Sequence, residues 1–121
     1  MPPPPDGKGL YVMDTPGQDI ESITGMVAGG AQIVVFSTGR GTATGCPVAP
    51  VIKLTANART WRNMEDSMDV TVADAIDGTL TLDRAADALF AEMVAVAGGK
   101  LTKAERSGHN EFAIYRVGYT Y

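Results

Sequence analysis

Residues 36–50, FSTGRGTATGCPVAP, combine glycines, threonines and an arginine in an arrangement suited to binding an anion. Glycine lets a ligand approach the backbone closely, so that successive N–H groups can converge on it. Arg40 adds a planar fork that fits a carboxylate or a phosphate, and the threonines add hydroxyls. A plain connector needs neither this length nor this chemistry. The substrate-binding residues that we expect are Thr38, Gly39, Arg40, Gly41 and Thr42.

Two familiar phosphate-binding loops are excluded by the residues that follow. No Gly-Lys-Ser/Thr ends the segment, and Pro47 and Pro50 favour extended chain where a G-x-G-x-x-G motif would open a helix. A nucleotide-binding module is therefore disfavoured. The alternative to an anion site is a long surface loop whose arginine pairs with a neighbouring carboxylate.

Three further side chains could take part in chemistry, and each also has a plain structural explanation. Asp14 could ligate a metal or act as a base, yet an Asp before Thr-Pro-Gly is also a common turn residue. His109 could be a general acid or base, or simply a solvated loop residue. Cys46 could help bind a metal, but a free cysteine is often a small buried hydrophobe. The acidic segment Glu65, Asp66 and Asp69 could bind a hard cation or form a solvated helix end.

Apolar patterning predicts the elements that position these residues. We expect strands at residues 10–13, 31–37, 51–55, near 68 and at 112–117. We expect a helix that starts at Asp19, with that residue as its N-cap, and ends at the glycines 29–30. Asn57 and Thr81 should cap two further helices. Residues 101–108 could form a helical turn. The last long helix has an apolar stripe along one side, formed by Leu82, Ala86, Leu89, Phe90, Met93 and Val96 or Ala97.

This element order predicts an α/β fold with a mostly parallel sheet. In such sheets ligands bind beyond the carboxyl ends of the strands. The segments DTPG (residues 14–17) and TGRGTATG (residues 38–45) each follow an expected strand. Residues 1–8, which are rich in proline, should form an arm or linker, and residues 9–121 a single domain.

Composition narrows the classes of partner and compartment. The net charge of −4 disfavours nucleic acid and anionic membrane as partners. No apolar run is long enough to span a membrane, and the start MPPPPDGKG is not a secretory signal. The single cysteine excludes an internal disulfide and fits a reducing compartment. We therefore expect a cytoplasmic protein.

Several motifs occur in order along the chain and carry a resemblance to a known family. They are D-T-P-G, T-G-hydrophobic-V-A-x-G-A, F-x-T-G-R-G and I-K-hydrophobic-x-x-N, followed by KLTKAERSGHNEFAIYRVG. From residue 8 to the end, the chain resembles the C-terminal part of the altronate and galactarate dehydratase family, which includes sulfolactate sulfo-lyases. One departure is the segment DVTVA (residues 69–73), where the family commonly has Asp-hydrophobic-Asn-Ala/Cys-Gly.

The resemblance implies a hydro-lyase that dehydrates a sugar acid to a 2-keto-3-deoxy acid with a divalent metal, Fe2+ or Mn2+. It also implies a Rossmann-like variant with an unusual crossover, so that the chain could be threaded or knotted. In this scheme Arg40 clamps the substrate carboxylate and Asp14 is the candidate metal ligand. Asp14, Arg40 and His109 are the candidate catalytic residues.

The family's complete enzymes are much longer, so two hypotheses remain open. The chain could be the C-terminal portion of a dehydratase, active with a missing upstream half or a partner chain. Alternatively, it could be an autonomous, non-catalytic α/β domain that retains an anion-binding TGRG loop and needs no cofactor. Because a sheet cut from a larger one exposes a strand edge, we also expect self-association as a homodimer.

Overall fold

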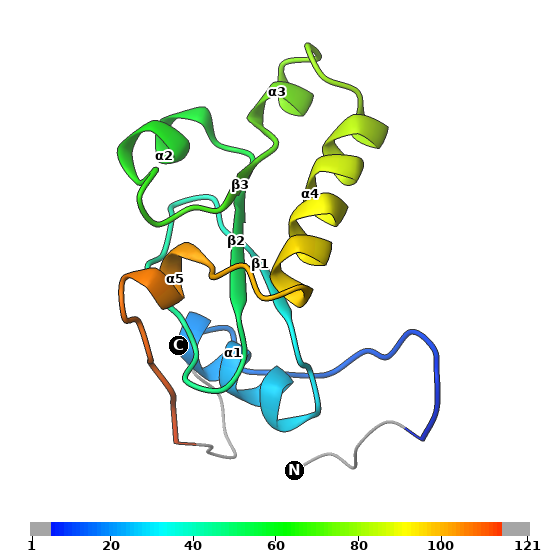
Figure 1. Cartoon of the computed structure of the whole chain (residues 1–121), viewed down its shortest axis with the longest axis vertical. Helices are drawn as coiled ribbons and strands as arrows, with labels where there is room; N and C mark the ends of the chain where they lie inside the picture. The colour runs from blue at the N-terminus through cyan, green and yellow to red at the C-terminus, as the bar shows by residue number, and fades with distance from the viewer. Residues whose placement is uncertain (1–5, 115–121) are drawn as a thin grey trace.

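The computed structural model describes residues 6–114, which form an α/β fold (Figure 1). The elements in chain order are α1 (Asp19–Ala28), β1 (Val34–Ser37), β2 (Val51–Thr55), α2 (Ala58–Asn63), β3 (Val70–Thr71), α3 (Ala73–Ile76), α4 (Leu82–Ala97) and α5 (Lys103–Arg106). None of the helices in this described part is long and apolar enough to cross a membrane.

The described strands form one parallel sheet in the order β1-β2-β3. Val34 pairs with Val51 at the start of β1, and Leu54 pairs with Val70 where β3 joins. The α/β class and the parallel sheet predicted from the sequence are therefore confirmed. The Rossmann-like variant and the unusual crossover or knot stay predictions.

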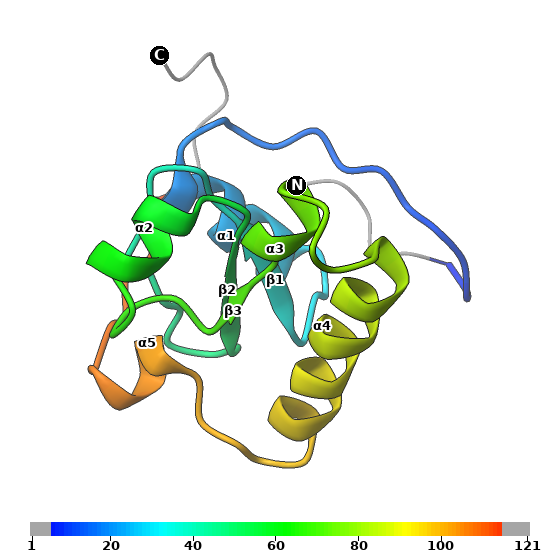
Figure 2. The ribbon, with the colours of Figure 1, turned by 90° about the horizontal axis from the view of Figure 1, so that it is seen from above.

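Apolar residues pack on both faces of the sheet, as expected for buried parallel strands. On one face Ile23 of α1 packs with Val34 and Val51. On the other, Ile52 and Val70 pack with Val96 of α4. Both views show α4 on one side of the strands, with α2 and α5 on the opposite side (Figures 1 and 2).

The connection from β1 to β2 contains no helix. Two neighbouring parallel strands need a crossover of about a dozen residues or more, usually a helix, because the chain must return along the sheet. Here residues 38–50 make that return as irregular chain. The expectation that a plain connector would not need this length was wrong: the parallel arrangement requires it.

Asp69 joins the sheet to the C-terminal part of the domain. Its carboxylate accepts hydrogen bonds from the backbone N–H of Lys53 in β2 (2.8 Å) and of Lys103 at the start of α5 (2.8 Å). The Asp69 N–H donates to the Lys53 carbonyl in return (2.9 Å). This acidic residue therefore works as a structural acceptor and not as a solvated helix end.

The helix caps largely follow the sequence signals. Asn57 accepts hydrogen bonds from two N–H groups at the start of α2, and Thr81 accepts one from the Arg84 N–H at the start of α4. A capping box of Thr102 and Glu105 opens α5. One expectation was wrong: Gln18 occupies the N-cap position of α1, and Asp19 is its first helical residue. Its charge still lies at the helix N-terminus, where the dipole favours it.

Two expected strands differ from the structure. Residues 10–13 are not a strand, and the side chains of Leu10 and Val12 are each 96% exposed. A short apolar run becomes a buried strand only where a neighbouring strand accepts its hydrogen bonds, and the described sheet places no strand beside it. Residues 112–114 are also irregular, and the rest of the strand predicted at 112–117 lies outside the described residues.

The apolar stripe expected on α4 was only partly right. Leu89 and Met93 pack toward the sheet, and Val96 is buried there. Leu82 and Phe90 are exposed, because the inward face also includes the small Ala85 and is rotated away from them. An apolar strip therefore remains on the outer face of α4. We call Leu82, Phe90 and Val94 the outer face.

Lys53 is the largest fully buried side chain in the described structure, at 0% exposed. It lies in the middle of β2, where the flanking Ile52 and Leu54 would lead one to expect another apolar residue. Burial lowers the pKa of Lys53 below its ordinary value of 10.5. Asp69 and Glu111 oppose this shift by their negative charge, and Lys103 adds to it.

The two valines of α4 provide a matched test of which face is inward. Val96 is 6% exposed and Val94 is 56% exposed. We expect Val96→Ala to lower the free energy of unfolding by about 2 kcal/mol through lost burial and a cavity. Val94→Ala should change it by less than about 0.5 kcal/mol. Urea denaturation measures both, and equal effects would show that the helix is oriented differently.

Lys53 should make stability depend on pH in the alkaline range. The pKa of Lys53 is lower in the folded chain than in the unfolded chain, where it is about 10.5. At a pH between these two values the unfolded chain binds more protons than the folded chain. The contribution of Lys53 to the free energy of unfolding therefore rises with pH. Relative to Lys53→Met, the wild-type chain should gain about 1.4 kcal/mol for each unit by which burial lowers the pKa. Urea titrations of both chains from neutral pH to about 10.5 would test this; a constant difference contradicts it.

Candidate functional site

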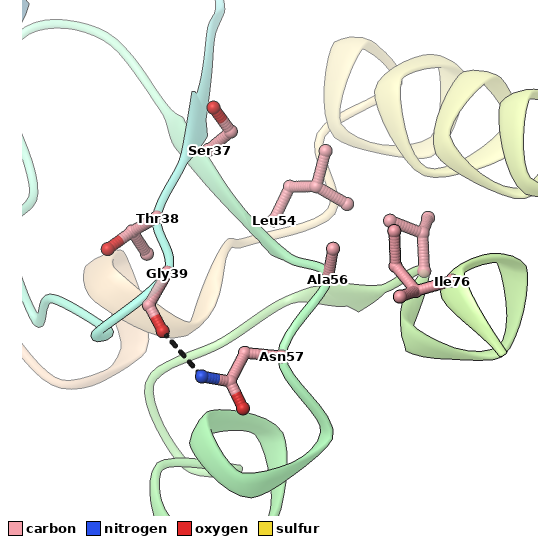
Figure 3. Close-up of a pocket in the computed structure, with 8 residues that line it drawn as sticks. Ser37, Thr38, Gly39, Leu54, Ala56, Asn57 and Ile76 are labelled. Carbon is pink, nitrogen blue, oxygen red and sulfur yellow. Dashed lines mark hydrogen bonds between the residues drawn. The ribbon is translucent and has the colours of Figure 1, made fainter.

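A pocket of about 440 Å³ lies at the carboxyl ends of the parallel strands (Figure 3). The ends of β1 and β2 and the segments after them contribute most of its wall. One part of the wall is polar and another apolar. The lining residues are Ser37, Thr38, Gly39, Leu54, Ala56, Asn57, Val72 and Ile76. This is the position in which parallel α/β sheets bind ligands.

The rim of this pocket is fixed by two side chains that hold one carbonyl. The Gly39 carbonyl accepts hydrogen bonds from Asn57 Nδ2 (3.1 Å) and Thr60 Oγ1 (2.7 Å). Figure 3 shows the Asn57 contact. Asn57 also caps α2 through its side-chain oxygen. The start of α2 therefore holds the glycine loop, defined here as residues 38–45.

Two of the three glycines in the loop have no room for a side chain, and the third has. Gly41 has a φ of 87°, and a Cβ there would lie 2.2 Å from Met64 Sδ. A Cβ at Gly45 would lie 2.2 Å from the His109 carbonyl oxygen. Gly39 has neither constraint, because its φ lies outside the left-handed region and no atom lies within 4 Å of an added Cβ. Packing explains two of the three glycines and leaves Gly39 open toward the pocket.

The second half of the loop is anchored by charged side chains. Lys53 Nζ donates to the Ala43 carbonyl (3.3 Å). The Gly45 N–H donates to Glu111 Oε2 (2.9 Å), and Glu111 Oε1 lies 2.8 Å from His109 Nδ1. The Gly45 hydrogen bond is the main reason that the pKa of Glu111 is lowered, and the contact with His109 adds to this. Glu111 is therefore held as a carboxylate.

The expected substrate-binding residues fall into three groups. Thr38 and Gly39 line the pocket, whereas Arg40, the next residue, is exposed and does not line it. The remaining two take part in contacts within the loop: the Gly41 N–H donates to Thr38 Oγ1 (3.1 Å), and Thr42 Oγ1 lies 2.8 Å from Thr44 Oγ1. The structure describes no hydrogen bond or ion pair of the Arg40 guanidinium among residues 6–114.

The other two expected residues lie away from this pocket wall. Asp14 is exposed in the segment that leads to α1. His109 is about one-third exposed and is connected to the far end of the glycine loop through Glu111. A second hollow of about 480 Å³ is lined by the start of α1, by Thr44 and by residues 112–113. The segment that follows DTPG and the glycine loop both line this hollow, although DTPG does not follow a strand as the sequence predicted.

Three residues that shape the site were not selected from the sequence as functional. Lys53 could have been noticed as a charged residue inside an apolar strand, VIKLT. Asn57 was recognised as a helix cap, and its second contact, with Gly39, depends on tertiary structure. Glu111 carried no signal of its own, because a glutamate in a polar segment is usually solvated.

Comparison with known proteins gives a consistent family. The family model described as "D-galactarate/Altronate dehydratase, C-terminal" matches residues 2–120. Similar curated proteins include the (2R)-sulfolactate sulfo-lyase subunit beta of Chromohalobacter salexigens, 39% identical, and the galactarate dehydratase (L-threo-forming) of Escherichia coli, 34% identical. The altronate dehydratase of Bacillus subtilis is 30% identical.

These similarities cover 92–93% of this chain but only 22–29% of the relatives. The chain therefore corresponds to about a quarter of each longer protein. The resemblance noted in the motifs is confirmed over nearly the whole sequence, and the chain belongs to the D-galactarate/altronate dehydratase C-terminal family.

Proposed function

We propose that the chain is the C-terminal portion of a hydro-lyase that removes water from an altronate- or galactarate-type sugar acid and gives a 2-keto-3-deoxy acid. The family and the names of the relatives support this reaction class. The chain supplies part of the substrate site, and further polypeptide equivalent to the upstream region of the relatives supplies the rest.

The observation that carries the proposal is the open position of Gly39. Two of the loop's glycines are required by packing, but Gly39 has space around it and lines the pocket at the carboxyl ends of the strands. A residue without a side chain at that position lets a ligand reach the backbone. Most of the pocket wall is apolar, and Ser37, Thr38 and Asn57 make its smaller polar part. Thr38 is one candidate partner for a hydroxyl of a sugar acid.

Arg40 is suited to the charge that develops during dehydration. Removing a proton from the carbon beside a carboxylate builds up additional negative charge on that group, which fixed donors must stabilise. Arg40 follows Gly39 in the chain, is exposed, and offers a planar fork that fits a carboxylate. The Gly39 amide is the first backbone candidate, because the Gly41 N–H already donates to Thr38. Thr42 remains a candidate for a sugar hydroxyl.

A divalent metal, Fe2+ or Mn2+, is proposed for the complete enzyme, where it would stabilise charge on the substrate carboxylate. The residues described here do not make a site for it by themselves. Asp14 is a single exposed carboxylate, and between residues 6 and 114 no group of three or more His, Cys, Asp or Glu side chains could hold an ion.

Calorimetric titration with galactarate and altronate, with and without manganese, tests the substrate site. We expect binding that Gly39→Val abolishes without changing the thermal midpoint, because the new side chain enters the pocket and not the core. Arg40→Lys should weaken binding by about tenfold, since lysine cannot keep both hydrogen bonds to a carboxylate.

Two outcomes would contradict this assignment. Unchanged affinity in both variants would place the ligand elsewhere. Absence of binding to the wild-type chain in all conditions would favour the non-catalytic domain that merely retains the loop. In a complete enzyme, full activity of the Arg40→Lys variant would remove the proposed carboxylate clamp.

The outer face of α4 is the surface that we propose for association. Leu82, Phe90 and Val94 are large apolar side chains exposed on one helix, and the chain matches only 22–29% of the length of its relatives, which have a long further region. We propose that this region covers the outer face in a complete enzyme. In the isolated chain a second copy takes its place, giving a homodimer.

Light scattering during size-exclusion chromatography tests the outer face. We expect the isolated chain to form a dimer that Phe90→Asp shifts to monomer, because the charge would be buried at the contact. The matched control is Ala91→Asp, which adds the same charge beside Asp87, on the neighbouring strip of the helix. A wild-type chain that is monomeric at high concentration, or a dimer that both variants weaken equally, would refute this contact.

A further inference from the structure

The carboxylate of Glu111 has a different partner at each oxygen. Oε2 accepts a hydrogen bond from the Gly45 N–H (2.9 Å), and Oε1 lies 2.8 Å from His109 Nδ1. The Gly45 contact has a fixed direction, because a backbone N–H can only donate. It therefore sets which oxygen faces the histidine.

The backbone that carries the histidine is also fixed. The His109 N–H donates to the Ala104 carbonyl (3.0 Å) next to α5. The His109 carbonyl packs where Gly45 has no side chain, because a Cβ there would lie 2.2 Å from its oxygen. The histidine is thus attached to the glycine loop both by its backbone and through Glu111.

Glu111 remains ionised at neutral pH. The Gly45 N–H, and then His109, hold the pKa of its carboxyl below the ordinary range. The nearby charge of Lys53 is of opposite sign. An ionised carboxylate can only accept hydrogen bonds, so a neutral imidazole facing Oε1 must present a donor at Nδ1.

We propose that Glu111 is a positioning residue: it holds neutral His109 with its proton on Nδ1 and leaves Nε2 as the unprotonated nitrogen. Nε2 is then a hydrogen-bond acceptor on a side chain that is about one-third exposed.

The chain has a single histidine, so long-range proton–nitrogen NMR of a labelled sample reports this residue alone. At a pH where the imidazole is neutral, we expect the wild-type chain to carry its proton on Nδ1. The opposite tautomer, with the proton on Nε2, would overturn the proposal without any variant.

Glu111→Gln gives a sharper test. The Gly45 N–H still needs an oxygen acceptor, so the amide oxygen of the glutamine takes that place and its NH2 group faces His109 Nδ1. Nδ1 must then accept, and the proton moves to Nε2. We expect the tautomer to reverse. The control is Glu65→Gln, the same change at an exposed glutamate, which should leave the tautomer as it is. An unreversed tautomer in folded Glu111→Gln contradicts the proposal.

The tautomer is measured in the ligand-free chain, so this test is separate from the test of the proposed function. If galactarate does not bind, the proposed function fails, and the tautomer still decides the positioning role of Glu111.

Discussion

The helix-free connection between β1 and β2 is the constraint on which the domain depends. A helix satisfies its own backbone hydrogen bonds, but an irregular crossover packed against the sheet has to find partners for them among side chains. The structure supplies these at three points. Asn57 and Thr60 hold the Gly39 carbonyl, Lys53 holds the Ala43 carbonyl, and Glu111 holds the Gly45 N–H.

These anchors also explain why charged residues lie inside a small domain. A buried lysine is costly unless it is hydrogen-bonded and near opposite charge. Lys53 has the Ala43 carbonyl as acceptor and the negative charges of Asp69 and Glu111 nearby. Asp69 in turn accepts two backbone N–H groups from separate elements. The polar interior therefore connects the crossover, the sheet and the C-terminal segment.

The same arrangement places the candidate functional residues at the two ends of the glycine loop. Near its start, Thr38 and the unobstructed Gly39 line the pocket beyond the strands. Near its end, Gly45 is joined through Glu111 to His109. The outer face of α4 and residues 10–12 are exposed apolar surfaces. They agree with a domain that corresponds to about a quarter of its relatives.

The family, the α/β class and the caps at Asn57 and Thr81 could be predicted from the amino-acid sequence. These are local signals: a motif, an apolar period or a capping side chain acts within a few residues. Two features depend on tertiary structure: residues 10–13 are not a strand, and one particular side of α4 faces the sheet. A strand needs a neighbouring strand to pair with, and the inward side of a helix depends on the surface against which it packs. Tertiary structure also decided the roles of Lys53 and Glu111. Each contacts residues distant in the chain, Ala43 for Lys53 and Gly45 for Glu111, and no local pattern encodes such a pairing.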